Sequence, residues 1–240
     1  MNLFNDEATT FAEHWSGFTA PAQRVVADAL GLREGMRVLD VGCGAGRFCA
    51  LASERGARVS GIDGAAAMIG IASATAPGAD LCVGPMERLP WPEATFDAVT
   101  GFNSLQFADD PVVALREWAR VTRPGGAIAI CVWGPHEECE LEALETPLRS
   151  EPWGPRFCER MLDVIDDAGL QLRAHGPVSV PYEAPDFEAL MAAMLFDARG
   201  YGVPEAEARV RIAPAAERFK RPDGSYRLEN QFRYAISARP

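Results

Sequence analysis

Residues 36–48 read Met-Arg-Val-Leu-Asp-Val-Gly-Cys-Gly-Ala-Gly-Arg-Phe, and they constrain the fold more than any other stretch. The apolar residues before the first glycine form the short run that a buried parallel strand requires. Residues 47–55 then carry apolar side chains at helical spacing. Because glycine has no Cβ, the turn between them can bend sharply and let a ligand lie against bare backbone. The stretch therefore predicts a strand, a glycine turn and a helix whose first amides point at a ligand.

The spacing of the glycines limits which ligand this turn can hold. A dinucleotide-binding turn requires Gly-x-Gly-x-x-Gly, but Arg47 occupies the last position of that pattern, and Asp40 would repel a pyrophosphate while it could face an ammonium group. The run resembles motif I of the class I S-adenosylmethionine-dependent methyltransferases. The resemblance implies that the turn packs against the methionine part of that cofactor, with these residues binding it: Asp40, Gly42, Cys43, Gly44 and Gly46. The alternative is an α/β turn without a ligand.

A second strand is predicted over residues 57–63, and it ends in an acid. Asp63 follows Gly46 at about the distance at which an α/β unit places the carboxylate that accepts ribose hydroxyls. One carboxylate can accept hydrogen bonds from both hydroxyls of a ribose. We therefore expect Asp63 to bind the cofactor ribose, although it could instead cap the next helix. The resemblance adds Gly64 at the same turn and Met68 beside the ribose and adenine.

Two further segments complete the predicted cofactor site. Residues 80–84 form a third strand, and the following residues resemble the family element that reads the adenine. Pro85 stands where the family often has an aspartate, so the adenine contacts are expected from the backbone of Met86 and Glu87. A fourth strand over residues 95–102 leads to Asn103 and Ser104, which should lie where the methyl group leaves sulfur. Both are poor bases, so we expect them to orient cofactor and acceptor, unless they only form a capping turn.

Residues 1–32 are expected to be helical and to form a lid over the cofactor pocket, as in related methyltransferases. His14 is then a candidate base, and Trp15 or Phe18 a candidate wall of the pocket. The spacing of these aromatic residues fits the buried face of a helix equally well. His136, which follows the predicted fifth strand, is the second candidate base. A catalytic base could also be absent, because positioning alone removes much of a barrier.

The second half of the chain carries weaker signals. Helices are expected over residues 111–121 and 157–168, and strands over residues 127–133 and 170–180. Residues 182–224 contain a helical insertion whose Met and Phe side chains either line an apolar acceptor pocket or pack as ordinary core. Residues 226–236 alternate between apolar and polar side chains, which predicts the long last strand of the sheet.

The composition excludes several kinds of partner. Among 240 residues the formal net charge is −11, with no basic run, and this argues against a nucleic-acid substrate. No apolar stretch approaches the roughly 20 residues of a membrane span, and the start of the chain is acidic, unlike a signal peptide. None of the six cysteines forms a Cys-x-x-Cys pair, so no metal site is expected. We expect a cytoplasmic protein.

Together these features predict one α/β domain over residues 1–240. The resemblance implies a doubly wound, Rossmann-like sheet of seven strands in the order 3-2-1-4-5-7-6, with the last strand antiparallel. It also implies methyl transfer from S-adenosylmethionine to a small-molecule acceptor, apolar or aromatic, with S-adenosylhomocysteine as product. The alternatives are a protein that binds these cofactors without catalysis and an NAD-dependent oxidoreductase, which the glycine spacing disfavours. The chain could be a monomer or a homodimer.

Overall fold

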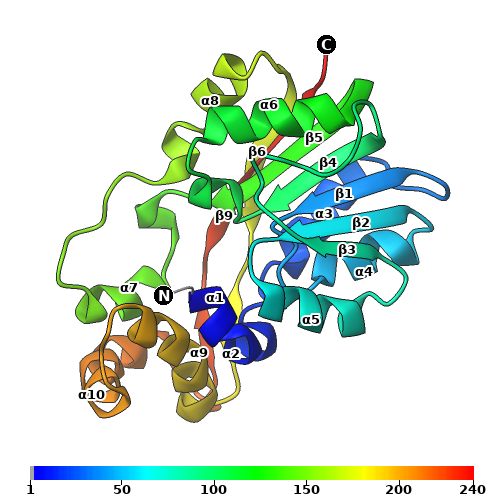
Figure 1. Ribbon diagram of the computed structural model, residues 1–240. Helices are drawn as coiled ribbons and strands as arrows, with labels where there is room; N and C mark the ends of the chain where they lie inside the picture. Colours follow the sequence, from blue (N-terminus) through cyan, green and yellow to red (C-terminus); the bar gives the residue numbers. More distant parts are fainter. Residues whose placement is uncertain (1–2) are drawn as a thin grey trace.

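The computed structural model describes residues 3–240, so the first two residues of the expected N-terminal lid lie outside it. The strands are β1 (Arg37–Val41), β2 (Arg58–Asp63), β3 (Asp80–Val83), β4 (Phe96–Phe102), β5 (Thr122–Trp133), β6 (Gln171–Ser179), β7 (Tyr182–Ala184), β8 (Tyr226–Leu228) and β9 (Gln231–Ala238). Seven of them form one sheet in the order β3-β2-β1-β4-β5-β9-β6, in which β9 runs antiparallel to both neighbours (Figure 1). Because β9 is the seventh strand of this sheet along the chain, the predicted order is confirmed.

Helices cover both faces of this sheet. They are α3 (Ala20–Ala29), α4 (Arg47–Glu54), α5 (Ala66–Thr75), α6 (Pro111–Val121) and α8 (Met161–Asp167). The alternating side chains of β1 show which helices pack on each face of the sheet. Val38 packs in a cluster with Phe48 of α4, whereas Leu39 and Val41 pack in a cluster with Trp118 of α6. Successive side chains of a strand point to opposite faces, so helices on both sides bury every residue of β1 after Arg37.

The remaining helices follow the carboxyl ends of the strands or belong to the N-terminus and the insertion. They are α1 (Leu3–Asp6), α2 (Ala8–His14), α7 (Glu142–Glu145), α9 (Phe187–Gly200), α10 (Glu205–Ala216) and the short 3₁₀ helices η1 (Leu105–Phe107), η2 (His136–Glu138), η3 (Thr146–Leu148), η4 (Phe157–Glu159) and η5 (Glu217–Phe219). Figure 1 shows α7, α9 and α10 together, away from α6, with α1 and α2 between α9 and α5. Two segments distant in sequence, the N-terminus and the insertion, therefore meet beside the sheet.

The structure corrects one prediction about the end of the chain. Residues 226–236 do not form one strand, because β8 pairs with β7 in a separate two-stranded sheet and β9 begins only at Gln231. Asn230 is fully buried at the break. Its Oδ1 accepts a hydrogen bond from the Leu141 amide at 3.1 Å, and its Nδ2 donates to the Leu228 carbonyl at 3.0 Å. These bonds tie the connector before α7 to the junction between the two sheets.

Candidate active site

One cavity of about 570 Å³ lies beyond the carboxyl ends of β1, β2 and β4, where open parallel sheets bind ligands. Most residues predicted to bind the cofactor line it: Asp40, Gly42, Cys43, Gly44, Asp63, Gly64, Met68, Met86, Glu87, Asn103 and Ser104. Gly46 is the exception, because it precedes α4 and packs against Ala72 of α5 instead. The structure thus brings together side chains from four separate segments of the sequence.

The glycine turn after β1 combines tight packing with an open face. Gly42 has φ +71°, and a Cβ built on it would fall 2.3 Å from the Cβ of Ser104. Gly44 has φ +51°, and the only atom within 4 Å of a Cβ there would be a ring carbon of Phe11, at 3.9 Å. Gly42 is therefore required for the packing of β1 against the segment after β4, whereas Gly44 presents bare backbone to the cavity.

Asp40 lies behind this turn and is almost completely buried. Its Oδ1 accepts a hydrogen bond from the hydroxyl of Thr100 on β4 at 2.8 Å. Burial raises the pKa of Asp40 to about 7; the bond from Thr100 opposes this shift and the nearby charge of Asp63 adds to it. A carboxylate that is poorly solvated in this way gains from a cationic partner, such as the ammonium group predicted from the sequence.

Asp63, at the end of β2, bonds both the glycine turn and the backbone just before the next helix. Its Oδ2 accepts from the Gly44 amide at 2.8 Å and its Oδ1 accepts from the Ala65 amide at 2.9 Å, just before α5. Burial raises the pKa of this carboxyl group. The two roles weighed for Asp63 are compatible, because it bonds the amide at the start of α5 and also lines the cavity.

Buried polar atoms without a partner indicate where a ligand is expected. Among residues 3–240, three side chains carry such an atom: Asn103 (Oδ1), Gln106 (Oε1) and Asp197 (Oδ2). All three line this cavity. Asn103 also has φ +50°, a conformation that costs a residue with a side chain on the order of 1 kcal/mol. Unpaired buried acceptors are rare in folded proteins, so their concentration here fits a site shaped around a ligand.

Aromatic side chains close the cavity on the side of α1 and α2. The ring of Phe4 lies 5.5 Å from that of Phe11, 5.6 Å from that of Phe107 and 5.8 Å from that of Phe196. Phe107 remains 62% exposed. Trp15 and Phe18 line the cavity and also belong to the buried cluster around α9, so both interpretations of these aromatic residues apply. The methionines of the insertion, in contrast, are buried core.

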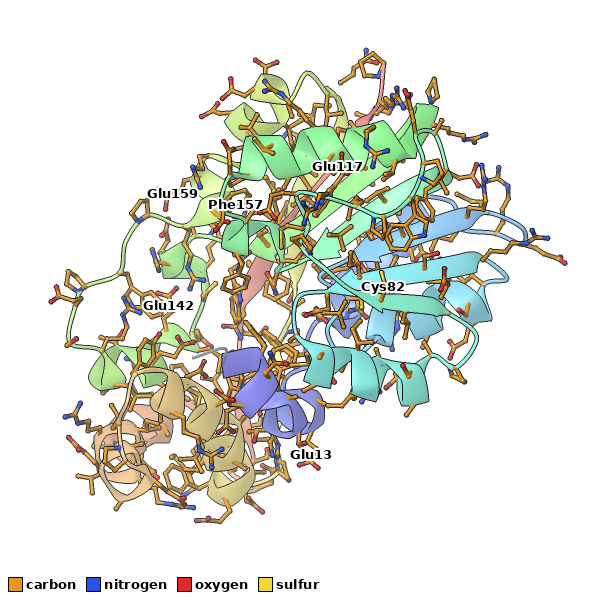
Figure 2. The ribbon with its side chains drawn as sticks, in the orientation of Figure 1. Glu13, Cys82, Glu117, Glu142, Phe157 and Glu159 are labelled. Carbon is orange, nitrogen blue, oxygen red and sulfur yellow. The ribbon has the colours of Figure 1, made fainter. Side chains whose placement is uncertain are left out.

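The two predicted histidines do not line the cavity. His14 is partly exposed, with its Nε2 3.9 Å from the carboxylate of Glu13. His136 has both ring nitrogens engaged, Nδ1 at 2.6 Å from a Glu142 oxygen and Nε2 at 2.8 Å from the Gly154 carbonyl. Figure 2 places Glu142 at α7, apart from the strands of the sheet. The geometry thus gives neither histidine access to a ligand in the cavity.

Charged residues line the cavity, and they include several that the sequence did not indicate. The carboxylates on its wall are Asp40, Asp63, Glu87, Asp109, Glu145 and Asp197, and the guanidinium groups are Arg47 and Arg156. Arg156 is held in an ion pair with the buried Glu142. The lining is therefore strongly acidic. The sequence carries one signal for Asp197, which is a single acid at the end of the apolar run of residues 190–196.

Comparisons with known proteins agree with this geometry. Residues 39–130 match the family model described as a methyltransferase domain. A demethylmenaquinone methyltransferase of Beutenbergia cavernae is 34% identical over 166 residues, which cover 64% of this chain and 69% of the relative. The chain belongs to the class I S-adenosylmethionine-dependent methyltransferases. The cofactor of this family is S-adenosylmethionine.

Other similar proteins match different fractions of this chain and of their own length. A malonyl-[acyl-carrier protein] O-methyltransferase of Pectobacterium atrosepticum is 29% identical over 213 residues, 84% of this chain and 81% of the relative. For most of the first curated relatives, however, the match spans about half of the relative's own length. A solved structure from Bacillus halodurans has a TM-score of 0.64 at 16% identity and covers 91% of this chain and 98% of its own, which shows the shared fold.

The described residues, 3–240, contain neither a metal-binding cluster nor a membrane-spanning helix. No group of three or more His, Cys, Asp or Glu side chains there has the arrangement of a metal site. None of the helices in this part of the chain combines the length and the apolar character needed to cross a membrane.

Proposed function

We propose that this methyltransferase transfers the methyl group of S-adenosylmethionine to a small-molecule acceptor in the cavity, with catalysis mainly by positioning. The observation that carries the proposal is the continuity of the cavity. It runs from the glycine turn and Asp63 to Trp133, Arg156 and Phe196, so one continuous space has a cofactor end and an end lined by aromatic and charged side chains. The relatives named above act on demethylmenaquinone and on a malonyl-acyl carrier protein, by their names.

The residues present fit the cofactor. The bare backbone at Gly44 admits the methionine part, Asp40 faces its ammonium group, and Asp63 accepts the ribose hydroxyls. When bound, the cofactor supplies a methyl group on a positive sulfonium, and an acidic wall favours such a cation. Pro85 lacks an amide hydrogen, so the adenine contacts fall to the backbone beyond it, where Met86 and Glu87 line the cavity.

The protein's part in the reaction is alignment and exclusion of water. Asn103 and Gln106 line the cavity from the segment after β4, and each carries a buried oxygen without a partner; they can hold the cofactor and the acceptor in line. The ring cluster around Phe4 covers the space from the side of α1 and α2, so we propose that residues 1–32 act as the lid and residues 182–224 as the wall of the acceptor pocket. Aromatic side chains at this end exclude water from the attacking atom.

Calorimetric titration with S-adenosylmethionine, S-adenosylhomocysteine and NAD tests the cofactor, and formation of S-adenosylhomocysteine with a panel of phenols, carboxylates and amines tests the transfer. We expect micromolar binding of the first two compounds, none of NAD, and turnover with at least one acceptor. Heat from NAD alone would overturn the assignment. Binding of S-adenosylhomocysteine without turnover across a broad panel would favour the non-catalytic alternative.

A further inference from the structure

A carboxylate with one buried, unpaired oxygen stands at the proposed acceptor end of the cavity. Asp197 lies near the end of α9, within a run of buried apolar residues, and its Oδ2 has no hydrogen-bond partner among residues 3–240. A buried polar group left in this state costs about 1–3 kcal/mol. Since Asp197 lines the cavity, a ligand that donates a hydrogen bond would remove this cost.

Glu145 of α7 brings a second carboxylate to the same wall. The two groups are close enough for their charges to interact, and burial together with the charge of Glu145 raises the pKa of Asp197 well above its usual range. Burial raises the pKa of Glu145 to about 7. Two carboxylates of like charge in a poorly solvated place repel each other. A proton or a cation that is shared by the two carboxylates would therefore stabilise the pair.

The surrounding residues do not supply that cation. No ion pair within 4.0 Å joins Asp197 or Glu145 to a Lys, Arg or His of the described chain. Arg149 bonds the Tyr201 hydroxyl at 3.0 Å, and this hydroxyl donates to Glu145 at 3.4 Å; the charge of Arg149 lowers the pKa of Glu145, but burial outweighs it. Arg156, one of the guanidinium groups on the cavity wall, is paired with Glu142.

Aromatic rings lie near Asp197. Trp15 donates from its Nε1 to the carbonyl of Ala193, one turn before Asp197, and its ring lies 5.5 Å from that of Tyr182. Burial and the charge of Asp197 raise the pKa of Tyr182 to about 12, which places this phenol near the carboxylate as a neutral neighbour. Phe196 precedes Asp197 on the cavity wall. Faces of such rings attract cations.

We propose that Asp197 and Glu145 bind a protonated amine carried by the methyl acceptor, whose body is apolar or aromatic; this ammonium group anchors the acceptor and, having no free electron pair, is not the atom that attacks the methyl group. This inference rests on the proposed function. An ammonium group carries three donors, so it can bond both carboxylates and remove their repulsion, whereas a neutral hydroxyl group satisfies one oxygen and leaves the repulsion. The excess of carboxylates over guanidinium groups along the wall favours the same charge.

Three matched probes test the inference on the full chain loaded with S-adenosylhomocysteine: 2-phenylethylamine, 2-phenylethanol and 3-phenylpropionate. Ligand-observed NMR titrations at pH 8 compare them, because the amine is still protonated there while Glu145 is largely ionised. We expect the amine to bind at least tenfold more tightly than the alcohol, and the carboxylate to bind more weakly than both. Equal binding of amine and alcohol would overturn the inference.

Substitutions of the two carboxylates test whether they bind the amine. Asp197→Asn and Glu145→Gln should each weaken binding of 2-phenylethylamine at least tenfold and leave the affinity for S-adenosylhomocysteine within twofold, which also shows that each variant folds. Glu188→Gln is the matched control, because Glu188 is an exposed acid on the same helix α9 that pairs with Arg209. Unchanged amine binding in both cavity variants would overturn the inference. Failure of the wild type to bind S-adenosylhomocysteine would instead contradict the proposed function.

Discussion

The carboxylate of Asp63 accepts a hydrogen bond from the amide of Gly44, with 2.8 Å between Oδ2 and the nitrogen. This bond joins the end of β2 to the glycine turn after β1, so the group expected to bind the ribose also fixes the backbone expected to contact the methionine part. The two halves of the cofactor site are thus built as one unit. Removing this carboxylate should affect both.

We therefore predict that Asp63→Ala weakens binding of S-adenosylhomocysteine by roughly ten- to hundredfold, the equivalent of about 1.5–3 kcal/mol for the loss of hydrogen bonds to a charged acceptor. Calorimetric titration measures the change. Asp80→Ala provides the control, because Asp80 is an exposed acid at the start of the neighbouring strand β3. Equal affinity in wild type and Asp63→Ala would rule out the ribose role of this carboxylate.

Two glycines give opposite predictions for the same substitution. Gly42→Ala should lower the free energy of unfolding by about 2 kcal/mol or more, because its Cβ would overlap that of Ser104 and its φ is +71°. Gly70 lies exposed inside α5, with nothing within 4 Å of a built Cβ. Gly70→Ala should raise the free energy of unfolding by about 0.5–1 kcal/mol. Urea unfolding measures both, and a neutral Gly42→Ala would contradict the packing described here.

The cofactor end of the site could be predicted from the sequence because its residues follow their strands directly. Asp40, Gly44 and Asp63 each lie within three residues of a strand end, so their place follows from the strand itself once a parallel sheet is assumed. Asn230 shows the limit of such patterns. The alternation of apolar residues continues through it, and only the tertiary bond to Leu141 reveals that two strands meet there.

The acceptor end could not be predicted in this way. Glu145 stands in a connector with many acids, and nothing local distinguishes it from Glu142, which binds His136 instead. The direction in which a connector folds depends on long-range packing, as Figure 1 shows for the segment that leads to α7. His14 and His136 were chosen because histidine is the usual base near neutral pH, but the turn after β5 directs His136 into the connector.

Asp40 should make the stability of the protein depend on pH. Because burial raises its pKa to about 7 in the folded state, against about 3.9 when unfolded, its contribution to stability is present below pH 4 and is lost as the pH rises toward 7. Asp40→Asn keeps an acceptor for Thr100 and removes the charge. Between pH 5 and pH 8 the free energy of unfolding of wild type minus that of the variant should fall by about 2–3 kcal/mol.

Urea unfolding of both proteins at several pH values measures this difference, and the comparison cancels the other titrating groups that the two chains share. Glu145, whose pKa burial also raises to about 7, shifts both curves equally. A difference that stays constant from pH 5 to pH 8 would show that Asp40 does not titrate in this range.

His136 should matter for stability and not for the cofactor. His136→Ala removes a partner of the buried Glu142 and frees the Gly154 carbonyl, so the free energy of unfolding should fall by about 1–3 kcal/mol. The affinity for S-adenosylhomocysteine should stay within twofold, because His136 does not line the cavity. His14→Ala, at a partly exposed side chain, should change stability by less than about 0.5 kcal/mol. A strong loss of cofactor affinity in His136→Ala would instead place this histidine in the site.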